Sequence, residues 1–224
     1  MVLNTAERFL ILIQHPEKKR FIISEPVKSA GLMGSILLDL TNDAKIELDN
    51  GKLTARSSET ALSSTHQEIL ERIAGESKIR KVRTWITRLS RKNGKYQKEI
   101  LSGLEKKGLI RIEHKRMLGI RYYRTRMINS RIRKQIIDEI RDHIFYGKQI
   151  DSKHSVILGL IKACRMYPII CRDKQERKIC KKRIREFMKS DEISQGVDRV
   201  IREMQAAITG AVVVSTITVA AGSR

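Results

Sequence analysis

Residues 27–40 read VKSAGLMGSILLDL, and this stretch decides the fold. Large apolar side chains recur three and four residues apart along it, which predicts a helix with a continuous apolar face. The residues on that face are Leu32, Ile36, Leu37 and Leu40. Gly31 and Gly34 carry no side chain that would hold a neighbour at a distance, so we expect another helix to pack closely there.

Working outward, a helix is expected over 5–14, capped by Thr5 and ended by Pro16. Residues 46–53 alternate around Asn50-Gly51, which is the strongest short signal for a β-hairpin. Residues 109–125 also alternate, and they predict a second hairpin that turns near Leu118-Gly119. Further helices are expected over 64–74, 79–91, 96–107, 130–145, 152–166, 173–189 and 194–219.

The chain has no internal repeat and no linker rich in Pro, Gly and Ser. We therefore predict a mainly α fold, a single globular helical domain over residues 1–224 with two β-hairpins and a buried apolar C-terminal helix. The apolar stretch 206–221 is 16 residues long, short of the ~20 that cross a bilayer. We interpret it as part of the buried helix, with a tail anchor as the alternative.

The charge is large and unevenly spread. Lys and Arg number 46 against 25 Asp and Glu, a net charge of +21. Residues 78–148 hold 22 basic and 6 acidic side chains, whereas residues 1–77 are slightly acidic overall. Charge concentrated in this way indicates docking on a polyanion, either nucleic acid or an anionic membrane. The hydrophobic fraction of 41% fits a folded soluble protein and argues against disorder or a multi-span membrane protein.

Motifs for catalysis are missing. There is no Walker loop, GxGxxG, HExxH or GxSxG, and the five His residues are scattered. The three Cys residues, Cys164, Cys171 and Cys180, form no Cys-x-x-Cys pair and are interpreted as buried structural thiols in a reducing compartment. We therefore expect a protein that is not an enzyme, with no catalytic residues, no cofactor and no metal.

Four cations of the middle third are the candidate ligands of lipid headgroup phosphates: Arg88, Arg91, Lys95 and Lys98. Lys95 and Lys98 are three residues apart, so they share a helix face and can hold a phosphate by charge. A solvated helix face is the alternative reading. Trp85 fits the apolar stripe of the helix over 79–91 and is expected in the core.

The tip of the second hairpin is the candidate membrane-contact segment. Apolar Met117, Leu118 and Ile120 stand at the turn, where solubility favours polar residues. Their basic flanks are Lys115, Arg116 and Arg121. Basic residues near an anionic surface are worth ~1 kcal/mol each, and buried aliphatic side chains add ~1.5–3 kcal/mol each. A hairpin that packs on its own core or on another subunit is the alternative.

A winged-helix nucleic-acid-binding protein is the alternative function. In that reading the helix over 96–107 enters DNA and the second hairpin is the wing. The helix is poor in base-reading Arg, Asn and Gln, and the apolar tip suits neither water nor phosphate, so nucleic acid is the less favoured partner.

The order and spacing of several segments resemble the Golgi phosphoprotein 3 family, in its bacterial type. These segments are Glu7–Leu12, Gly31–Leu40, Lys45–Leu48, Trp85–Ser90 and Leu104–Ile110. The resemblance implies a largely helical, cytoplasmic protein that is peripheral on the cytosolic membrane face. It also implies a pocket for phosphatidylinositol 4-phosphate, a hairpin that supports membrane contact or homo-oligomerisation, and binding of short cytosolic tails of membrane proteins.

The family's pocket positions fall on Ser24, Met33, Gly94 and Gln97, and all four depart from the eukaryotic side chains. This favours looser binding of acidic phospholipid headgroups, of the phosphatidylinositol 4-phosphate kind, through the charge of the middle third. The combined expectation is an anionic membrane lipid held by the four helix cations, with the apolar hairpin tip dipping into the interface.

Overall fold

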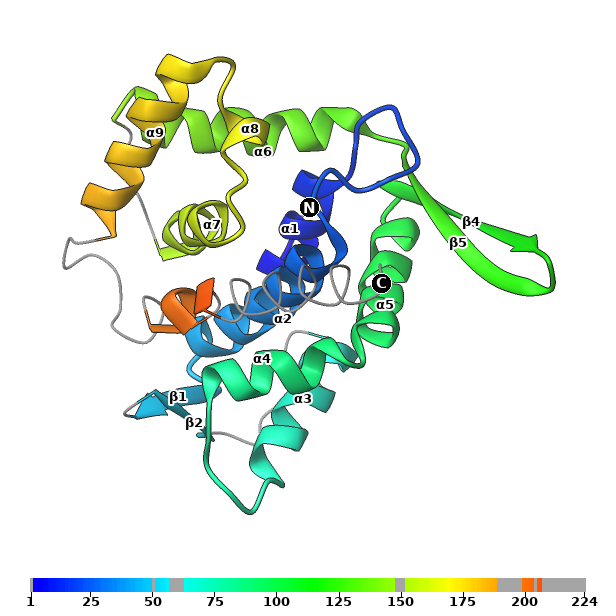
Figure 1. The fold of residues 1–224 in the computed structure, drawn as a ribbon, viewed down its shortest axis with the longest axis vertical. Helices are drawn as coiled ribbons and strands as arrows, with labels where there is room; N and C mark the ends of the chain where they lie inside the picture. Colours follow the sequence, from blue (N-terminus) through cyan, green and yellow to red (C-terminus); the bar gives the residue numbers. More distant parts are fainter. Residues whose placement is uncertain are drawn as a thin grey trace, which may run out of the picture.

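The computed structural model describes residues 2–49, 51–56, 63–147, 152–188, 199–203 and 205–206, and it confirms a mainly α fold (Figure 1). The helices are α1 (Thr5–Ile13), α2 (Glu25–Asn42), α3 (Ser64–Ala74), α4 (Val82–Ser90), α5 (Asn93–Lys106), α6 (Ser130–Phe145), α7 (Ser152–Ala163), α8 (Tyr167–Ile170) and α9 (Lys174–Phe187). The strands are β1 (Ile46–Asp49), β2 (Lys52–Ala55), β3 (Arg80–Lys81), β4 (Ile110–Met117) and β5 (Ile120–Met127).

Helix α2 is the centre of the fold. Every residue from Lys28 to Leu40 is buried, and α1, α4, α5 and α7 all contact this helix (Figure 1). The sequence predicted a helix with one apolar face. The structure buries all sides of it, because small residues between the large apolar ones let neighbours approach from every direction.

Gly31 is the point of closest approach on α2. A Cβ atom built there would collide with the ring of Phe9 in α1 and would lie 2.8 Å from Cys164 Sγ, just after α7. Real Cβ atoms do not tolerate such distances, so only glycine allows these three segments to meet. The expected close helix packing is confirmed at this residue.

Asp39 ties the other end of α2 to its neighbours. Its buried carboxylate accepts the N–H of Thr5 at 3.0 Å and the N–H of Ala6 at 3.2 Å, and lies 3.1 Å from His66 Nε2 in α3. A carboxylate at the first turn of α1 also suits the positive end of that helix. One side chain thus holds three helices together.

The predicted cap of α1 was wrong by one residue. Asn4 rather than Thr5 is the N-cap, because its side chain accepts the N–H of Glu7 at 2.8 Å. The Glu7 carboxylate in turn accepts the N–H of Asn4 at 3.1 Å. The pair forms a capping box, which satisfies two backbone donors that the helix leaves free.

The first hairpin is confirmed, but it belongs to a three-stranded sheet. Strands β1 and β2 pair antiparallel from Ile46↔Ala55 to Asp49↔Lys52. Strand β3 then adds to β2, so residues 80–81, predicted as helix, are extended and α4 begins at Val82. The short helix α8 was not predicted; a proline lies in its first turn.

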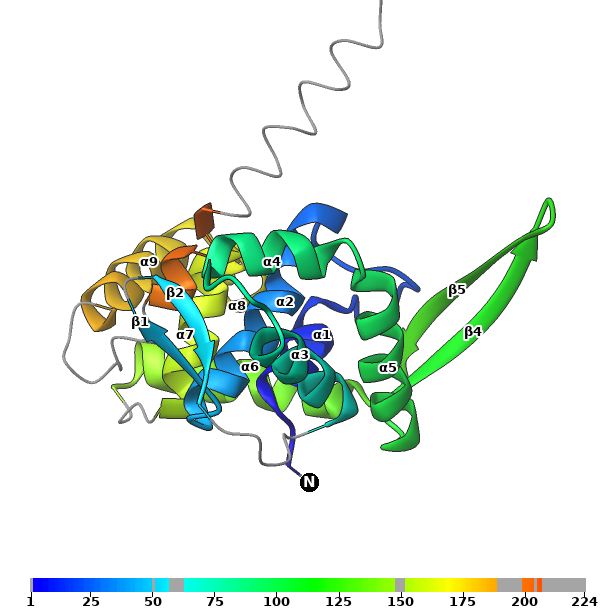
Figure 2. The ribbon, with the colours of Figure 1, turned by 90° about the horizontal axis from the view of Figure 1, so that it is seen from below.

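The second hairpin is confirmed together with its turn. Strands β4 and β5 pair from Ile110↔Met127 to Met117↔Ile120, leaving Leu118 and Gly119 as the two turn residues. Beyond α5 the hairpin projects from the body of the protein (Figures 1 and 2). Its buried base, at Ile110 and Met127, anchors it to the core.

The expected C-terminal helix over 194–219 lies mostly outside the described residues. Residues 199–203 are helical, and Val200 and Ile201 are buried there. Within the described ranges, no helix combines the length and apolar character that crossing a bilayer requires. The single domain over residues 1–224 stays a prediction.

We predict that Gly31→Ala destabilises the protein by about 1–3 kcal/mol, because the new methyl group overpacks the contact between α1, α2 and α7. Gly103→Ala is the matched control, since its Cβ would meet only Glu7 Oε1, at 3.9 Å. Urea unfolding measures both variants. A Gly31→Ala protein as stable as Gly103→Ala would contradict the close approach.

Candidate functional site

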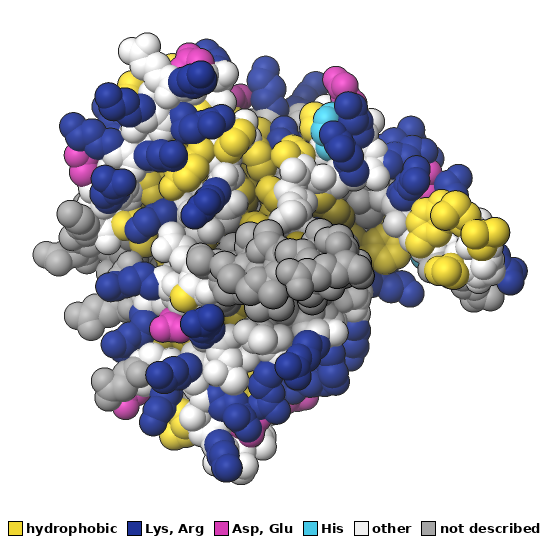
Figure 3. Space-filling view, in the orientation of Figure 1, with side chains coloured by type: hydrophobic (Ala, Val, Ile, Leu, Met, Phe, Trp, Pro, Cys, Tyr) yellow, Lys and Arg dark blue, Asp and Glu magenta, His cyan; other side chains and the backbone are white. Residues whose placement is uncertain are grey.

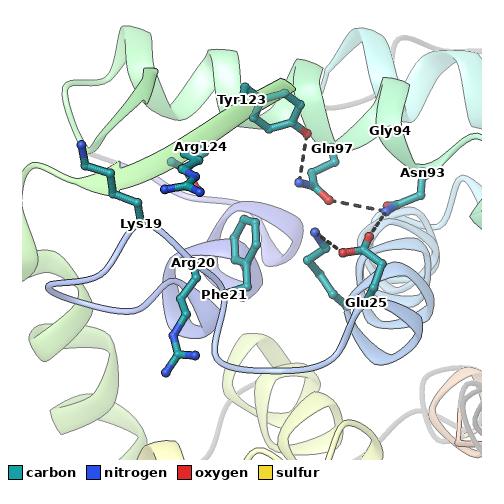
Figure 4. Close-up of a pocket in the computed structure, with 11 residues that line it drawn as sticks. Lys19, Arg20, Phe21, Glu25, Asn93, Gly94, Gln97, Tyr123 and Arg124 are labelled. Carbon is teal, nitrogen blue, oxygen red and sulfur yellow. Dashed lines mark hydrogen bonds and ion pairs between the residues drawn. The ribbon is translucent and has the colours of Figure 1, made fainter. Parts of the chain in front are cut away.

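A hollow of about 340 Å³ opens between the start of α2, the start of α5, the loop before α2 and the base of β5 (Figure 4). Four cations line this cationic pocket, together with a single carboxylate. They are Lys19, Arg20, Lys28, Arg124 and, as the carboxylate, Glu25. The residues of the wall come from segments that lie far apart in sequence, and only the fold brings them together.

Two helix N-termini add to the positive character of the pocket. Helix α2 begins at Glu25 and α5 begins at Asn93, and both residues line the hollow. The first turns of helices carry unpaired N–H groups and the positive end of the helix dipole. Helix ends and cationic side chains therefore act in the same sense, and the pocket attracts an anion.

A chain of hydrogen bonds organises the pocket floor (Figure 4). Lys28 Nζ lies 2.8 Å from the Glu25 carboxylate, which also accepts a hydrogen bond from Asn93 Nδ2 at 3.3 Å. Asn93 Nδ2 lies 3.4 Å from Gln97 Oε1, and Gln97 Nε2 donates to the Tyr123 hydroxyl at 3.0 Å. These contacts hold the pocket-lining ends of α2, α5 and β5 in one arrangement.

Lys28 is the most constrained cation of the pocket. Its side chain is 7% exposed, and its ammonium group lies 4.4 Å from the centroid of the Phe21 ring. A buried charge needs partners, and here the Glu25 carboxylate and the aromatic face supply them. An anion in the pocket would meet a cation that is already fixed in place.

Nothing in the described part of the chain is arranged for catalysis through metal or thiolate. No three His, Cys, Asp or Glu residues of that part come together as metal ligands. Cys164, Cys171 and Cys180 are buried free thiols, as predicted. Loss of solvation raises the pKa of Cys164 and of Cys180 to about 12, so both thiols stay protonated.

Two of the four predicted helix cations are ion-paired. Arg88 pairs with Glu76, and hydrogen bonds from Arg80 and then from Arg88 lower the pKa of Glu76 to about 2. Lys95 Nζ lies 2.5 Å from Glu68 in α3, and this contact lowers the pKa of Glu68. Both carboxylates therefore remain ionised at neutral pH and partly offset the two cations.

The other two predicted helix cations, Arg91 and Lys98, are exposed. Lys98 follows Gly94 of the pocket by four residues, which places the two on the same face of α5. Lys95 pairs with Glu68 of α3 and is not among the residues that line the pocket. Trp85 is buried, which confirms its predicted place in the core.

The tip of the second hairpin exposes the apolar residues that the sequence singled out. Met117 is 63% exposed, Leu118 95% and Ile120 71%. Lys115 and Arg116 beside them are also exposed, whereas the side chain of Arg121 lies outside the described set. Among the described residues, these three aliphatic side chains stay largely exposed, which marks an apolar contact surface.

Leu118 also has an unfavourable backbone. Its φ is +50°, and Gly119 has φ +81°, so the turn is of the kind that has left-handed residues at both central positions. Asn, Asp or Gly usually occupies the first of these positions, because a branched apolar side chain strains there. Leucine is thus disfavoured twice, by exposure and by conformation.

The hairpin and the cationic pocket form one structural unit. Tyr123, Arg124 and Thr125 of β5 belong to the pocket wall, and Lys19 of the pocket pairs with Glu113 of β4 at 2.7 Å. The hairpin tip, α4 and the start of α2 all lie toward the upper side in Figure 2. Figure 3 shows that face from the front, with the apolar tip at the right and many Lys and Arg side chains across it.

Sequence reasoning missed the cations of the pocket. Lys19 and Arg20 belong to the basic run 18–20, which was a usable signal. Lys28 stands in the first turns of an otherwise buried helix, and a lysine there is a second signal. Arg124 was predicted only as part of the second hairpin, because the other three cations of the pocket are more than 90 residues earlier in sequence.

Two of the positions that the family resemblance indicated line this pocket, namely Gly94 and Gln97. Ser24 is exposed and precedes the first residue of α2. Met33 is fully buried in the core. Two of the four indicated positions thus border the pocket, two do not, and the cations of the pocket come from other positions.

A mainly helical core, a basic face and a projecting hairpin define the class: a mainly helical protein that carries a cationic pocket and an apolar-tipped hairpin. The sequence profile described as Golgi phosphoprotein 3 (GPP34) matches residues 5–204. The chain belongs to this family. Among curated proteins, no sequence is significantly similar to it.

We predict that Glu25→Gln raises the affinity of the protein for inorganic pyrophosphate by roughly fivefold. The change removes the only carboxylate among the residues that line the pocket and frees the Lys28 ammonium, a gain of about 1 kcal/mol. Isothermal titration calorimetry measures the affinity. Glu71→Gln on α3 makes the same charge change elsewhere and should leave the affinity nearly unchanged; equal affinities for the two variants would contradict the pocket's role.

Proposed function

We propose that this chain is a peripheral membrane protein without catalytic activity, which docks on anionic phospholipid at the cytosolic membrane face. The observation that carries the proposal is Leu118: it is 95% exposed, in a left-handed conformation, at the tip of a hairpin whose base is a wall of the cationic pocket. A leucine at this position becomes favourable when its side chain is transferred from water into the membrane interface.

The free energy of membrane binding in this proposal comes from both the apolar hairpin tip and the cations. Burial of three aliphatic side chains in the membrane interface contributes about 1.5–3 kcal/mol each, and each cation near the surface contributes about 1 kcal/mol. Stable but reversible membrane binding generally requires two such signals acting together. The hairpin and the basic face supply one signal each.

The cations divide into two groups in this proposal. Exposed Arg91, Lys98, Lys115 and Arg116 meet headgroup phosphates directly. Arg88 and Lys95 exchange their carboxylate partners for phosphate on docking, which costs little because surface ion pairs are worth at most about 1 kcal/mol. Arg121 joins the tip as the cross-strand neighbour of Arg116.

The pocket holds one headgroup phosphate, with Lys19, Arg20, Lys28 and Arg124 as ligands. The two family positions that line the pocket, Gly94 and Gln97, carry no charge that would select one headgroup, so the proposed ligand is acidic phospholipid as a class. Short cytosolic tails of membrane proteins and a second copy of the chain at the hairpin are the further partners that family membership suggests.

We predict that Leu118→Asn weakens binding to vesicles of phosphatidylcholine with 20% phosphatidylglycerol by about tenfold or more. Asn-Gly is the preferred pair for this turn, so the hairpin is kept and the melting temperature should stay equal or rise. The lost term is the burial of one leucine, about 1.5–3 kcal/mol. Vesicle flotation gives the affinity, and thermal unfolding gives the stability.

Leu118→Met is the matched control, because it keeps an apolar tip and should keep the binding. Wild-type binding by Leu118→Asn would overturn the docking mode. If Leu118→Asn instead changed the mass of the protein measured by analytical ultracentrifugation in the absence of vesicles, the tip would be assigned to self-association. A sequence-preferring DNA complex that survives physiological salt would favour the winged-helix alternative, since charge alone gives weak and salt-sensitive binding.

A further inference from the structure

A second cationic hollow, separate from the pocket, lies between the C-terminal end of α7, helix α8 and helix α9. Its volume is about 500 Å³, and no Asp or Glu is among the residues that line it. Its cations are Lys162, Arg165, Arg177, Lys181 and Arg185. The residues of this α7–α9 groove lie outside the basic middle third of the sequence and outside the second hairpin.

The cations of the groove lack carboxylate partners within the described ranges, whereas cations around it have theirs. On the same helix, Lys182 reaches Glu186 at 3.9 Å. Arg141 of α6 binds Glu176 through both guanidinium nitrogens at 2.7 Å. The carboxylates of α9 are thus used elsewhere, and five like charges are left to face one hollow.

One cation of the groove is partly withdrawn from water, and another, which is exposed, lies over an aromatic ring. Arg177 is half-buried, and its buried Nε has no hydrogen-bond partner in the described structure. Lys181 Nζ lies 5.4 Å from the centroid of the Tyr167 ring. A buried donor without an acceptor is costly, and a bound anion would supply that acceptor.

Arg165 provides an independent observation. Its φ is +53°, and it follows α7 at the position where helices usually end on glycine. The N–H of Arg165 donates to the carbonyl of Lys162 at 3.4 Å, and the N–H of Met166 donates to that of Ile161 at 2.9 Å. The hydrogen bonds of this turn come from the backbone alone, so glycine would serve there, yet the residue is an arginine that lines the groove.

The groove belongs to the same face as the hairpin tip. Helices α8 and α9 lie at the upper left in Figure 2 and the hairpin tip at the upper right. Figure 3 shows Lys and Arg side chains around apolar surface at the upper left, over α8 and α9. A flat anionic surface that meets the hairpin tip would therefore also meet this groove.

We propose that the α7–α9 groove binds the phosphate headgroup of a second anionic phospholipid in the membrane on which the hairpin docks. This inference rests on the proposed function. The guanidinium groups of Arg165, Arg177 and Arg185 suit phosphate oxygens, and Lys162 and Lys181 add point charge. Two anchor points at opposite ends of one face raise the affinity by making the second contact intramolecular, and they set the orientation of the protein.

The test compares two double variants that remove equal charge. Arg165→Gly with Lys181→Gln empties the groove of two cations, and Gly relieves the strained turn. Lys178→Gln with Lys182→Gln removes two exposed cations of α9 that do not line the groove. The probes are phosphatidylcholine vesicles with and without 20% phosphatidylglycerol, read by flotation.

We expect the groove variant to bind the phosphatidylglycerol vesicles about tenfold or more weakly, with a melting temperature that does not fall. The control variant should lose less than about threefold. If the two variants lost vesicle affinity equally, the effect of the groove cations would be no more than that of any surface charge, and the inference would be overturned.

Other outcomes separate this inference from the proposed function. Wild-type binding by the groove variant, while Leu118→Asn loses binding, would overturn the groove and leave the proposed function standing. Wild-type binding by both would overturn both. The groove variant could also lose binding of pyrophosphate and keep its binding to vesicles. That result would assign the groove to a dissolved anion and overturn the proposal that it binds a lipid headgroup.

Discussion

The rest of the structure depends on the burial of α2 on all sides. Once Gly31 lets α1 and α7 close on this helix, most of its polar side chains are left near its two ends. Asp39 at one end fixes α1 and α3, and Glu25 with Lys28 at the other end forms the floor of the cationic pocket. The same helix therefore determines the packing of the core and the placement of the site.

Two of the three described non-glycine residues with positive φ lie at the surfaces to which we assign lipid. Residues Ala44, Leu118 and Arg165 have positive φ without being glycine in the described ranges. Leu118 forms the apolar tip, and Arg165 lies at the α7–α9 groove. Natural sequences agree with local preference at most positions and depart from it where function requires a particular side chain.

Local signals in the sequence predicted the hairpins, the helix α6 and the core place of Trp85. Alternating residues flank Gly51 and Gly119, and glycine suits a tight turn, so the two hairpin predictions held. Strand β3 was missed because two residues form a strand only when β2, about 27 residues earlier, pairs with them. The cationic pocket and the pairing of Lys95 with Glu68 were missed for the same reason: both depend on contacts between distant segments.

The central claim is that the hairpin tip and the cationic pocket face one membrane, and tryptophan fluorescence tests it most directly. The native Trp85 is buried in the core, so a change in emission on vesicle binding can be assigned to the tryptophan introduced by Leu118→Trp. Lys106→Trp, at the lower end of α5 in Figure 2, serves as the reference for the far side. With phosphatidylglycerol vesicles that carry brominated acyl chains, we predict a blue shift and quenching at position 118 and neither at position 106. Unshifted, unquenched emission from position 118 on bound protein would contradict the account.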